Sequence, residues 1–109
     1  MTDHTTQDPY RPPVQDHELI KIIGRGSYGE VWLARNIMGA YRAVKVVRRD
    51  RFRDARPYER ELEGIRLFEP ISRAHQGFIH ILHIGEDPAR GAFYYVMELG
   101  DDITHGQTI

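Results

Sequence analysis

The chain has 109 residues, 40% of them hydrophobic and 28% charged, which is the composition of one small globular domain. A net charge of −1 gives no electrostatic reason to expect a nucleic acid or an acidic membrane surface as a partner. There is no cysteine, so disulfides and thiolate metal sites are excluded, and we expect a reducing, cytoplasmic location. No run of about 18 apolar residues occurs, so we predict no transmembrane segment in the chain, and we predict no metal site within it.

The N-terminal segment is polar and is followed by Pro9, Pro12 and Pro13. We predict that residues 1–15 form a flexible or extended lead-in. Three apolar, β-branched runs then predict strands, at residues 19–23, 31–34 and 41–47. The turns between these strands are short, which implies antiparallel pairing.

The third of these strands alternates in character, which places Ala43, Lys45 and Val47 on one face of the sheet. Between it and the strand before, Asn36 to Gly39 has the residues of a turn. A lysine on this strand can reach phosphate groups that a glycine-rich loop at residues 24–29 would hold.

Residues 57–69 have helical periodicity, with an apolar stripe of Tyr58, Leu62, Ile65 and Phe68. Pro57 fits the first turn of a helix, and Pro70 disfavours its continuation, so we expect the helix to end there. Two more apolar runs predict strands, at residues 78–82 and 93–97, with a loop that begins at Gly85. The predicted order is β-β-β-α-β-β, an α+β fold with a five-stranded antiparallel sheet and one main helix.

The loop after the first predicted strand reads Gly24-Arg25-Gly26-Ser27-Tyr28-Gly29-Glu30-Val31. Glycines at this spacing leave backbone N–H groups free to surround phosphate oxygens. A dinucleotide-binding loop has the same glycine spacing, and Asp50 follows at about the right distance for its acidic residue. That interpretation requires a helix directly after Gly29, where the residues favour a strand. A Walker A loop requires a lysine after the last glycine, and Glu30 stands there.

The ordered set of motifs resembles the N-terminal lobe of a eukaryotic-type serine/threonine protein kinase, bacterial members included. That family combines a glycine loop ending in valine, a lysine on the third strand and a glutamate on the helix. Here these are the loop at 24–31, the Ala43-Val44-Lys45 motif and the helix at 57–69. The resemblance covers residues 17–102. It implies a kinase lobe at 16–100 and, at 101–109, the start of the connection to a second lobe that the chain does not contain.

The periodicity of the helix selects one of its three glutamates as the partner of Lys45. Glu61 lies about 45° from the centre of the apolar stripe, whereas Glu59 and Glu63 lie about 115° and 155° away. A carboxylate at the edge of a buried stripe needs a partner. The resemblance independently implies that Glu61 pairs with Lys45, which would bind the α- and β-phosphates of ATP.

The resemblance also implies the other residues of an ATP site. Met97 would be the gatekeeper, and the carbonyl of Glu98 and the N–H of Gly100 would pair with the adenine edge. The full set expected to bind ATP is Ile23, Gly24, Arg25, Gly26, Ser27, Tyr28, Gly29, Val31, Ala43, Lys45, Met97, Glu98, Leu99 and Gly100.

Phosphoryl transfer in this family needs a catalytic-loop aspartate and the ligands of Mg²⁺, in His-Arg-Asp and Asp-Phe-Gly motifs beyond the hinge. Neither motif occurs in residues 1–109. We therefore expect the chain to be a fragment of a longer kinase, inactive alone, in which the second lobe binds the protein substrate and Mg²⁺. The alternative is a nucleotide-binding or interaction module that performs no catalysis.

Overall fold

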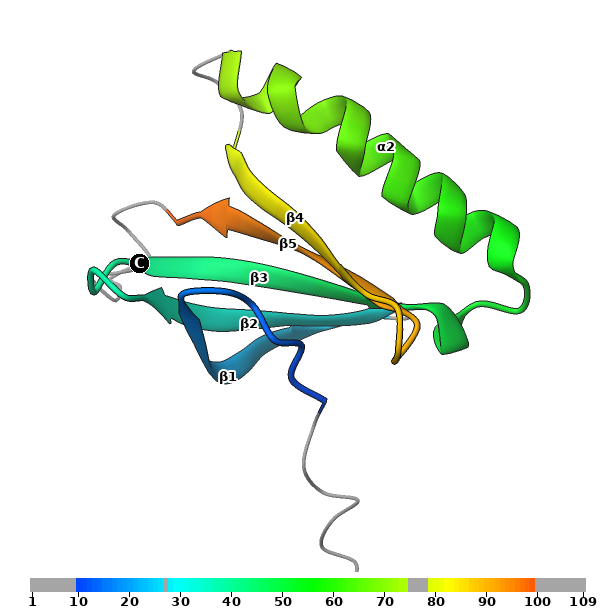
Figure 1. The fold of residues 1–109 in the computed structure, drawn as a ribbon, viewed down its shortest axis with the longest axis horizontal. Coiled ribbons are helices and arrows are strands. Elements are labelled where there is room, and N and C mark those ends of the chain that lie inside the picture. The colour runs from blue at the N-terminus through cyan, green and yellow to red at the C-terminus, as the bar shows by residue number, and fades with distance from the viewer. Residues whose placement is uncertain (1–9, 27, 75–78, 100–109) are drawn as a thin grey trace, which may run out of the picture.

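A computed structural model describes residues 10–26, 28–74 and 79–99, which form one sheet and one main helix (Figure 1). The elements are β1 (His17–Arg25), β2 (Gly29–Asn36), β3 (Tyr41–Arg48), the 3₁₀ turn η1 (Arg49–Arg51), α2 (Ala55–Ala74), β4 (Ile81–Asp87) and β5 (Ala92–Glu98). All neighbouring strands pair antiparallel, in the order β1-β2-β3-β5-β4. The predicted α+β class and the β-β-β-α-β-β order are confirmed, and the arrangement is like that of a protein-kinase N-terminal lobe.

Helix α2 lies along one face of the sheet and packs on it through the predicted apolar stripe (Figure 1). The buried residues of this helix-side cluster are Val47, Tyr58, Leu62, Ile81, Phe93 and Tyr95. Ile65 and Phe68 pack against the cluster from the next turns of the helix, so the whole predicted stripe faces the sheet. This burial fixes the helix beside β4 and β5, on the same face of the sheet as Lys45.

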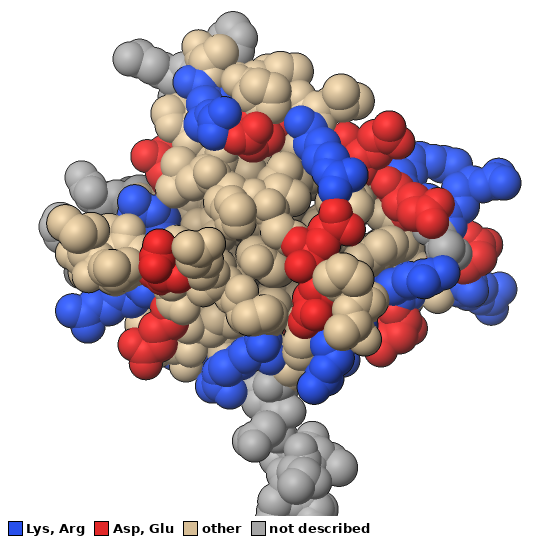
Figure 2. Space-filling model, in the orientation of Figure 1, with Lys and Arg blue, Asp and Glu red and all other residues tan. Residues whose placement is uncertain are grey.

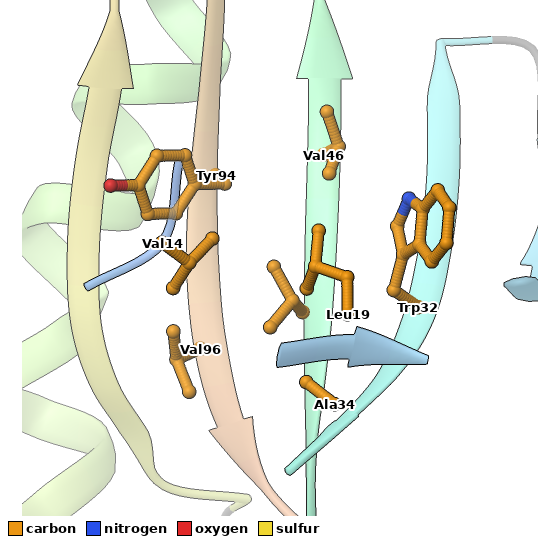
Figure 3. Close-up of a cluster of buried hydrophobic side chains, with 8 residues drawn as sticks. Val14, Leu19, Trp32, Ala34, Val46, Tyr94 and Val96 are labelled. Atoms are coloured by element: carbon orange, nitrogen blue, oxygen red, sulfur yellow. The ribbon is translucent and has the colours of Figure 1, made fainter. Parts of the chain in front are cut away.

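The opposite face of the sheet carries a second cluster, which we call the outer cluster. Its buried residues are Val14, Leu19, Trp32, Ala34, Val44, Val46, Tyr94 and Val96. Figure 3 shows the side chains of β2, β3 and β5 standing on one side of the sheet while α2 passes behind it. The predicted alternation along β3 is thus confirmed, because Val44 and Val46 belong to this cluster and Val47 to the other.

The last residues of the predicted lead-in, which was expected to be flexible or extended, pack on the outer cluster. Val14 is only 6% exposed, and the Arg11 guanidinium lies 4.9 Å from the centre of the Trp32 ring. The Tyr10 hydroxyl donates a hydrogen bond to Asp87, and burial together with this bond raises the pKa of Tyr10. The chain therefore packs on the sheet from Tyr10 onward, where it covers an apolar face. Residues 1–9 lie outside the described part.

Helix α2 also differs from the prediction at its end, because it continues through Pro70 to Ala74. Proline removes one backbone N–H from the helix, so the last turn needs support from elsewhere. Ser72 supplies it: its hydroxyl donates to the carbonyl of Glu69 at 2.7 Å and accepts the N–H of Ile81 at 3.0 Å. The end of the helix is thereby joined to the start of β4.

Replacing Ser72 with alanine is expected to lower the free energy of unfolding by about 1–3 kcal/mol. The side chain is fully buried, so its loss leaves the N–H of Ile81 without this acceptor and away from water. Urea unfolding followed by the fluorescence of Trp32, the single tryptophan, would measure the change. An unchanged midpoint would show that the last turn is held by other contacts.

Strand β4 lies further along the chain than the predicted range of 78–82. It spans Ile81–Asp87 and includes Gly85, where the sequence predicted the start of a loop, while Phe78 lies outside the described residues. Gly85 pairs with Tyr94, and a Cβ there would lie 2.3 Å from the Tyr94 hydroxyl oxygen. The glycine therefore makes room for a ring and does not end the strand.

Strand β1 is irregular at two points and forms one edge of the sheet. Its register with β2 shifts between Leu19 and Lys21 and again between Ile22 and Gly24, so two residues are bulged. A bulge bends its strand and increases the local twist. The second bulge lies where β1 enters the glycine loop.

The surface is of mixed charge: Figure 2 shows Lys and Arg side chains interspersed with Asp and Glu over the face in view. Within the described residues, no helix is long and apolar enough to cross a membrane.

Candidate functional site

The glycine loop and Lys45 enclose a pocket of about 280 Å³ at one end of the sheet. Its lining consists of Gly24, Arg25, Gly26, Tyr28, Gly29, Val31 and Lys45. All seven belong to the set expected to bind ATP. The fold thus brings half of that set together around one cavity.

The loop is held in shape by backbone contacts and not by its side chains alone. The N–H of Gly26 donates to the carbonyl of Gly29 at 2.9 Å, and the N–H of Arg48 donates to the carbonyl of Tyr28 at 2.9 Å. Gly29 lies against β3 so closely that a Cβ would be 1.8 Å from the carbonyl oxygen of Val46. Its lack of a side chain is what allows this approach.

A buried carboxylate anchors the base of the loop, a feature that the sequence did not reveal. The Glu30 side chain is 5% exposed and pairs with Arg51 at 2.8 Å and with Arg48 at 3.6 Å. Arg48 ends β3 and Arg51 lies in η1, so this ion cluster joins the connection between β3 and α2 to the glycine loop. The only sequence signal is that Glu30 directly follows Gly29 at the start of a strand.

Lys45 lies at the centre of β3, opposite Val31 on one side and Tyr95 on the other. None of the ion pairs within 4.0 Å among the described residues involves this lysine. Its ammonium group is therefore available to an anion in the pocket. Arg25 adds a second cation to the lining, so the cavity favours a negatively charged ligand.

Glu61 lies on α2 but does not form the predicted ion pair with Lys45 in this structure. Its side chain is exposed and lines a separate pocket of about 250 Å³ beside α2. Burial, and then the negative charge of Glu61, raise the pKa of Tyr95 to about 12. Since Tyr95 is the neighbour of Lys45 in the register, the two charges lie on one face of the sheet without pairing.

The other residues predicted to bind ATP are placed outside the glycine-loop pocket. Ile23 is 46% exposed at the second bulge of β1, and Ala43 is buried in β3. Met97 lines an apolar pocket under α2, while Glu98 pairs with His80 at 3.1 Å. Leu99 follows the end of β5.

Two residues of the predicted set lie outside the described residues. These are Ser27 in the glycine loop and Gly100 after β5.

Comparison with known proteins shows sequence similarity over part of the chain. The chain is 41% identical over 49 residues to the serine/threonine-protein kinase RIM15 of Saccharomyces cerevisiae. The chain is similar to a serine/threonine kinase over part of its length. The match covers 44% of this chain and 3% of that kinase, and no protein-family profile matches the chain. The similarity agrees with the sheet and helix of a kinase N-terminal lobe.

Proposed function

We propose that the chain is the ATP-binding lobe of a serine/threonine protein kinase. The observation that carries this proposal is the pocket in which the glycine loop faces a lysine with no ion-pair partner among the described residues. In that pocket the backbone N–H groups of the loop would contact the phosphates, and Lys45 would bind the α- and β-phosphates. The partial similarity to a serine/threonine kinase supports the same ligand.

The adenine would lie further along the strands, toward the end of β5. Ile23, Val31 and Ala43 would cover its upper side, and Met97 would lie at the back as gatekeeper. The carbonyl of Glu98 would accept a hydrogen bond from the adenine edge, and the N–H of Gly100 would donate one. These two contacts involve the main chain, so they place little demand on side-chain identity.

A second lobe is part of the proposal, and the apolar surface below α2 supports it. A pocket of about 440 Å³ there is lined by Ile65, Phe68, Ile79, Ile81, Tyr95 and Met97. Ile79 is 65% exposed, so this lining includes apolar surface in contact with water. A second lobe that packs here would cover the surface and complete the ATP site from below.

Phosphoryl transfer would require that second lobe. It would supply the aspartate that orients the substrate hydroxyl, the ligands of Mg²⁺ and the surface for the protein substrate. We expect residues 1–109 to bind ATP weakly, with a near-millimolar dissociation constant or weaker, and to transfer no phosphate. The unformed Lys45–Glu61 pair favours the alternative of a non-catalytic module, and catalytic-loop and magnesium motifs downstream of Ile109 in the gene would argue against that alternative.

Replacing Lys45 with methionine is expected to weaken ATP binding by about tenfold to a hundredfold. The estimate follows from the loss of hydrogen bonds between one charged donor and the phosphates. A titration of the whole chain with ATP at constant ionic strength, followed by backbone amide NMR shifts, would measure the affinity of the original chain and set a lower limit on the dissociation constant of the variant. The shifts should be largest in the glycine loop.

Lys21→Met is the matched control, because Lys21 is the other lysine of the chain and is exposed on β1. It removes the same charge from outside the pocket and should leave the ATP affinity within twofold of the original. Equal losses in both variants would mean that ATP is attracted by overall charge alone. That result would contradict the proposed site.

A further inference from the structure

Tyr28 borders both of the pockets that contain the two charges expected to pair. It is the one residue in the described part of the chain that lines both the glycine-loop pocket and the pocket beside α2. Lys45 lines the first of these pockets, and Glu61 lines the second. Tyr28 is thus next to the pocket of each charge.

An aromatic stack holds Tyr28 in this place. Its ring lies parallel to that of Phe52, with the centroids 4.2 Å apart and an angle of 6° between the planes. Phe52 follows η1 in the connection between β3 and α2. The tip of the glycine loop is therefore held by the segment that leads into the helix.

The stack continues into the core under the helix. The ring of Phe52 meets that of Tyr58 edge-on at 5.8 Å, and Tyr58 meets Phe93 at 5.2 Å. Tyr58 belongs to the first turn of α2, and Phe93 is fully buried in β5. A row of four rings thus connects the glycine loop to the packing of α2 on the sheet.

We propose that the Tyr28–Phe52 stack is a latch that keeps Lys45 and Glu61 apart. This inference rests on the proposed function, in which Lys45 binds phosphate and Glu61 positions it. Tyr28 and Phe52 are positioning residues: while they are stacked, the tyrosine ring occupies the space between the two charges. Release of the stack frees that space, and the ion pair forms. Aromatic pairs of this kind shift a two-state equilibrium by about twofold to tenfold.

The composition of the chain allows a direct test without nucleotide. Lys21 and Lys45 are its two lysines, so a chain labelled with ¹⁵N- and ¹³C-lysine gives two sets of side-chain NMR signals. Lys21→Met assigns them. The response of the Lys45 signals to Glu61→Gln then reports whether the two side chains are paired.

The expected result is a response that depends on the stack. In the original chain, Glu61→Gln should shift the Lys45 signals only slightly. In a chain with Tyr28→Ala, Glu61→Gln should shift them, because release of the stack raises the paired population by about twofold to tenfold. Phe52→Leu removes the same stack from its other side and should have the same effect, which guards against a folding defect in either variant.

Two matched variants isolate the contribution of the stacked ring. Tyr28→Phe keeps the ring and should behave as the original chain, so a response like that of Tyr28→Ala would overturn the latch. Tyr41→Ala removes an exposed tyrosine that lies under Arg35, away from the pocket, and should also behave as the original.

Two further outcomes would overturn the inference. One is a response to Glu61→Gln that is as large in the original chain as in the Tyr28→Ala chain, since the stack would then not separate the charges. The other is no response in either the Tyr28→Ala or the Phe52→Leu chain. Because the readout contains no ATP, failure here is distinguishable from failure of the proposed function, which the Lys45→Met titration tests.

Discussion

Replacing Gly29 with alanine should destabilise the fold by about 3 kcal/mol, a large effect for one methyl group. The added Cβ would lie 1.8 Å from the carbonyl oxygen of Val46 and 2.9 Å from its carbonyl carbon. Both are backbone atoms, and Gly29 pairs with Val47 in the ladder between β2 and β3. The strands must therefore separate locally, which also disturbs the loop above Lys45. Urea unfolding followed by Trp32 fluorescence would measure the loss.

Gly26→Ala is the matched control for this prediction. An added Cβ at Gly26 has its nearest described neighbour, the carbonyl oxygen of Gly29, at 4.0 Å, which is ordinary contact. Its effect on stability should stay within about 0.5 kcal/mol, as at other surface positions. If the two substitutions cost the same, the close approach of Gly29 to β3 is not the cause of the effect.

Phe93→Ala should lower the free energy of unfolding by about 3–5 kcal/mol, the range for removing a buried ring. Phe93 is fully buried in the helix-side cluster, between Tyr58 at 5.2 Å and Tyr95 at 6.4 Å. The cavity left behind would remove the support of α2 at its first turn. Thermal unfolding followed by circular dichroism at 222 nm, a wavelength sensitive to α2, would report the loss.

The control for Phe93→Ala is a substitution at an exposed aliphatic residue. Ile37 is 71% exposed in the turn between β2 and β3, so Ile37→Ala should change stability by less than about 0.5 kcal/mol. A small effect at Phe93 would mean that α2 is held mainly by its C-terminal half, through Ser72 and Ile81.

The sequence was sufficient for the main elements of the fold because local chemistry decides them. Short turns between the first three strands require antiparallel pairing, and the structure has it. The turn after β2 follows from Asn36, whose side-chain oxygen accepts the N–H groups of Met38 and Ala40, and from Gly39 with φ of 89°. The apolar stripe of α2 was predictable for the same reason, because it depends on the residues of one segment.

The predictions of secondary structure that were wrong concern places where a residue distant in the sequence decides the local structure. Pro70 should end a helix, but Ser72 joins the following turn to β4 and keeps it helical. Gly85 is typical of a turn, but here it accommodates the ring of Tyr94 within a strand. Neither partner can be identified from the neighbouring residues in the sequence.

In the candidate site, too, features set by neighbouring residues were predictable and contacts between distant segments were not. The residues around the glycine-loop pocket were predictable, because they follow one another along β1 and β2 and lie next to Lys45 in the register. Periodicity placed Glu61 on the correct helix but could not give its distance from Lys45. The stack of Tyr28 on Phe52 joins two loops, and no periodic pattern links loops to each other.

The two bulges of β1 affect how the molecule behaves among other copies of itself. An edge strand presents unpaired backbone groups that can add a strand from another chain, and this leads to aggregation. The bulged residues are Ile20 and Ile23, which are 38% and 46% exposed. On a regular edge strand, such exposed apolar side chains would favour association with another chain. Because each bulge interrupts the spacing of the free N–H and C=O groups, a second strand cannot pair along the full length of β1. The bend that leads into the glycine loop thus also protects the β1 edge of the sheet from self-association.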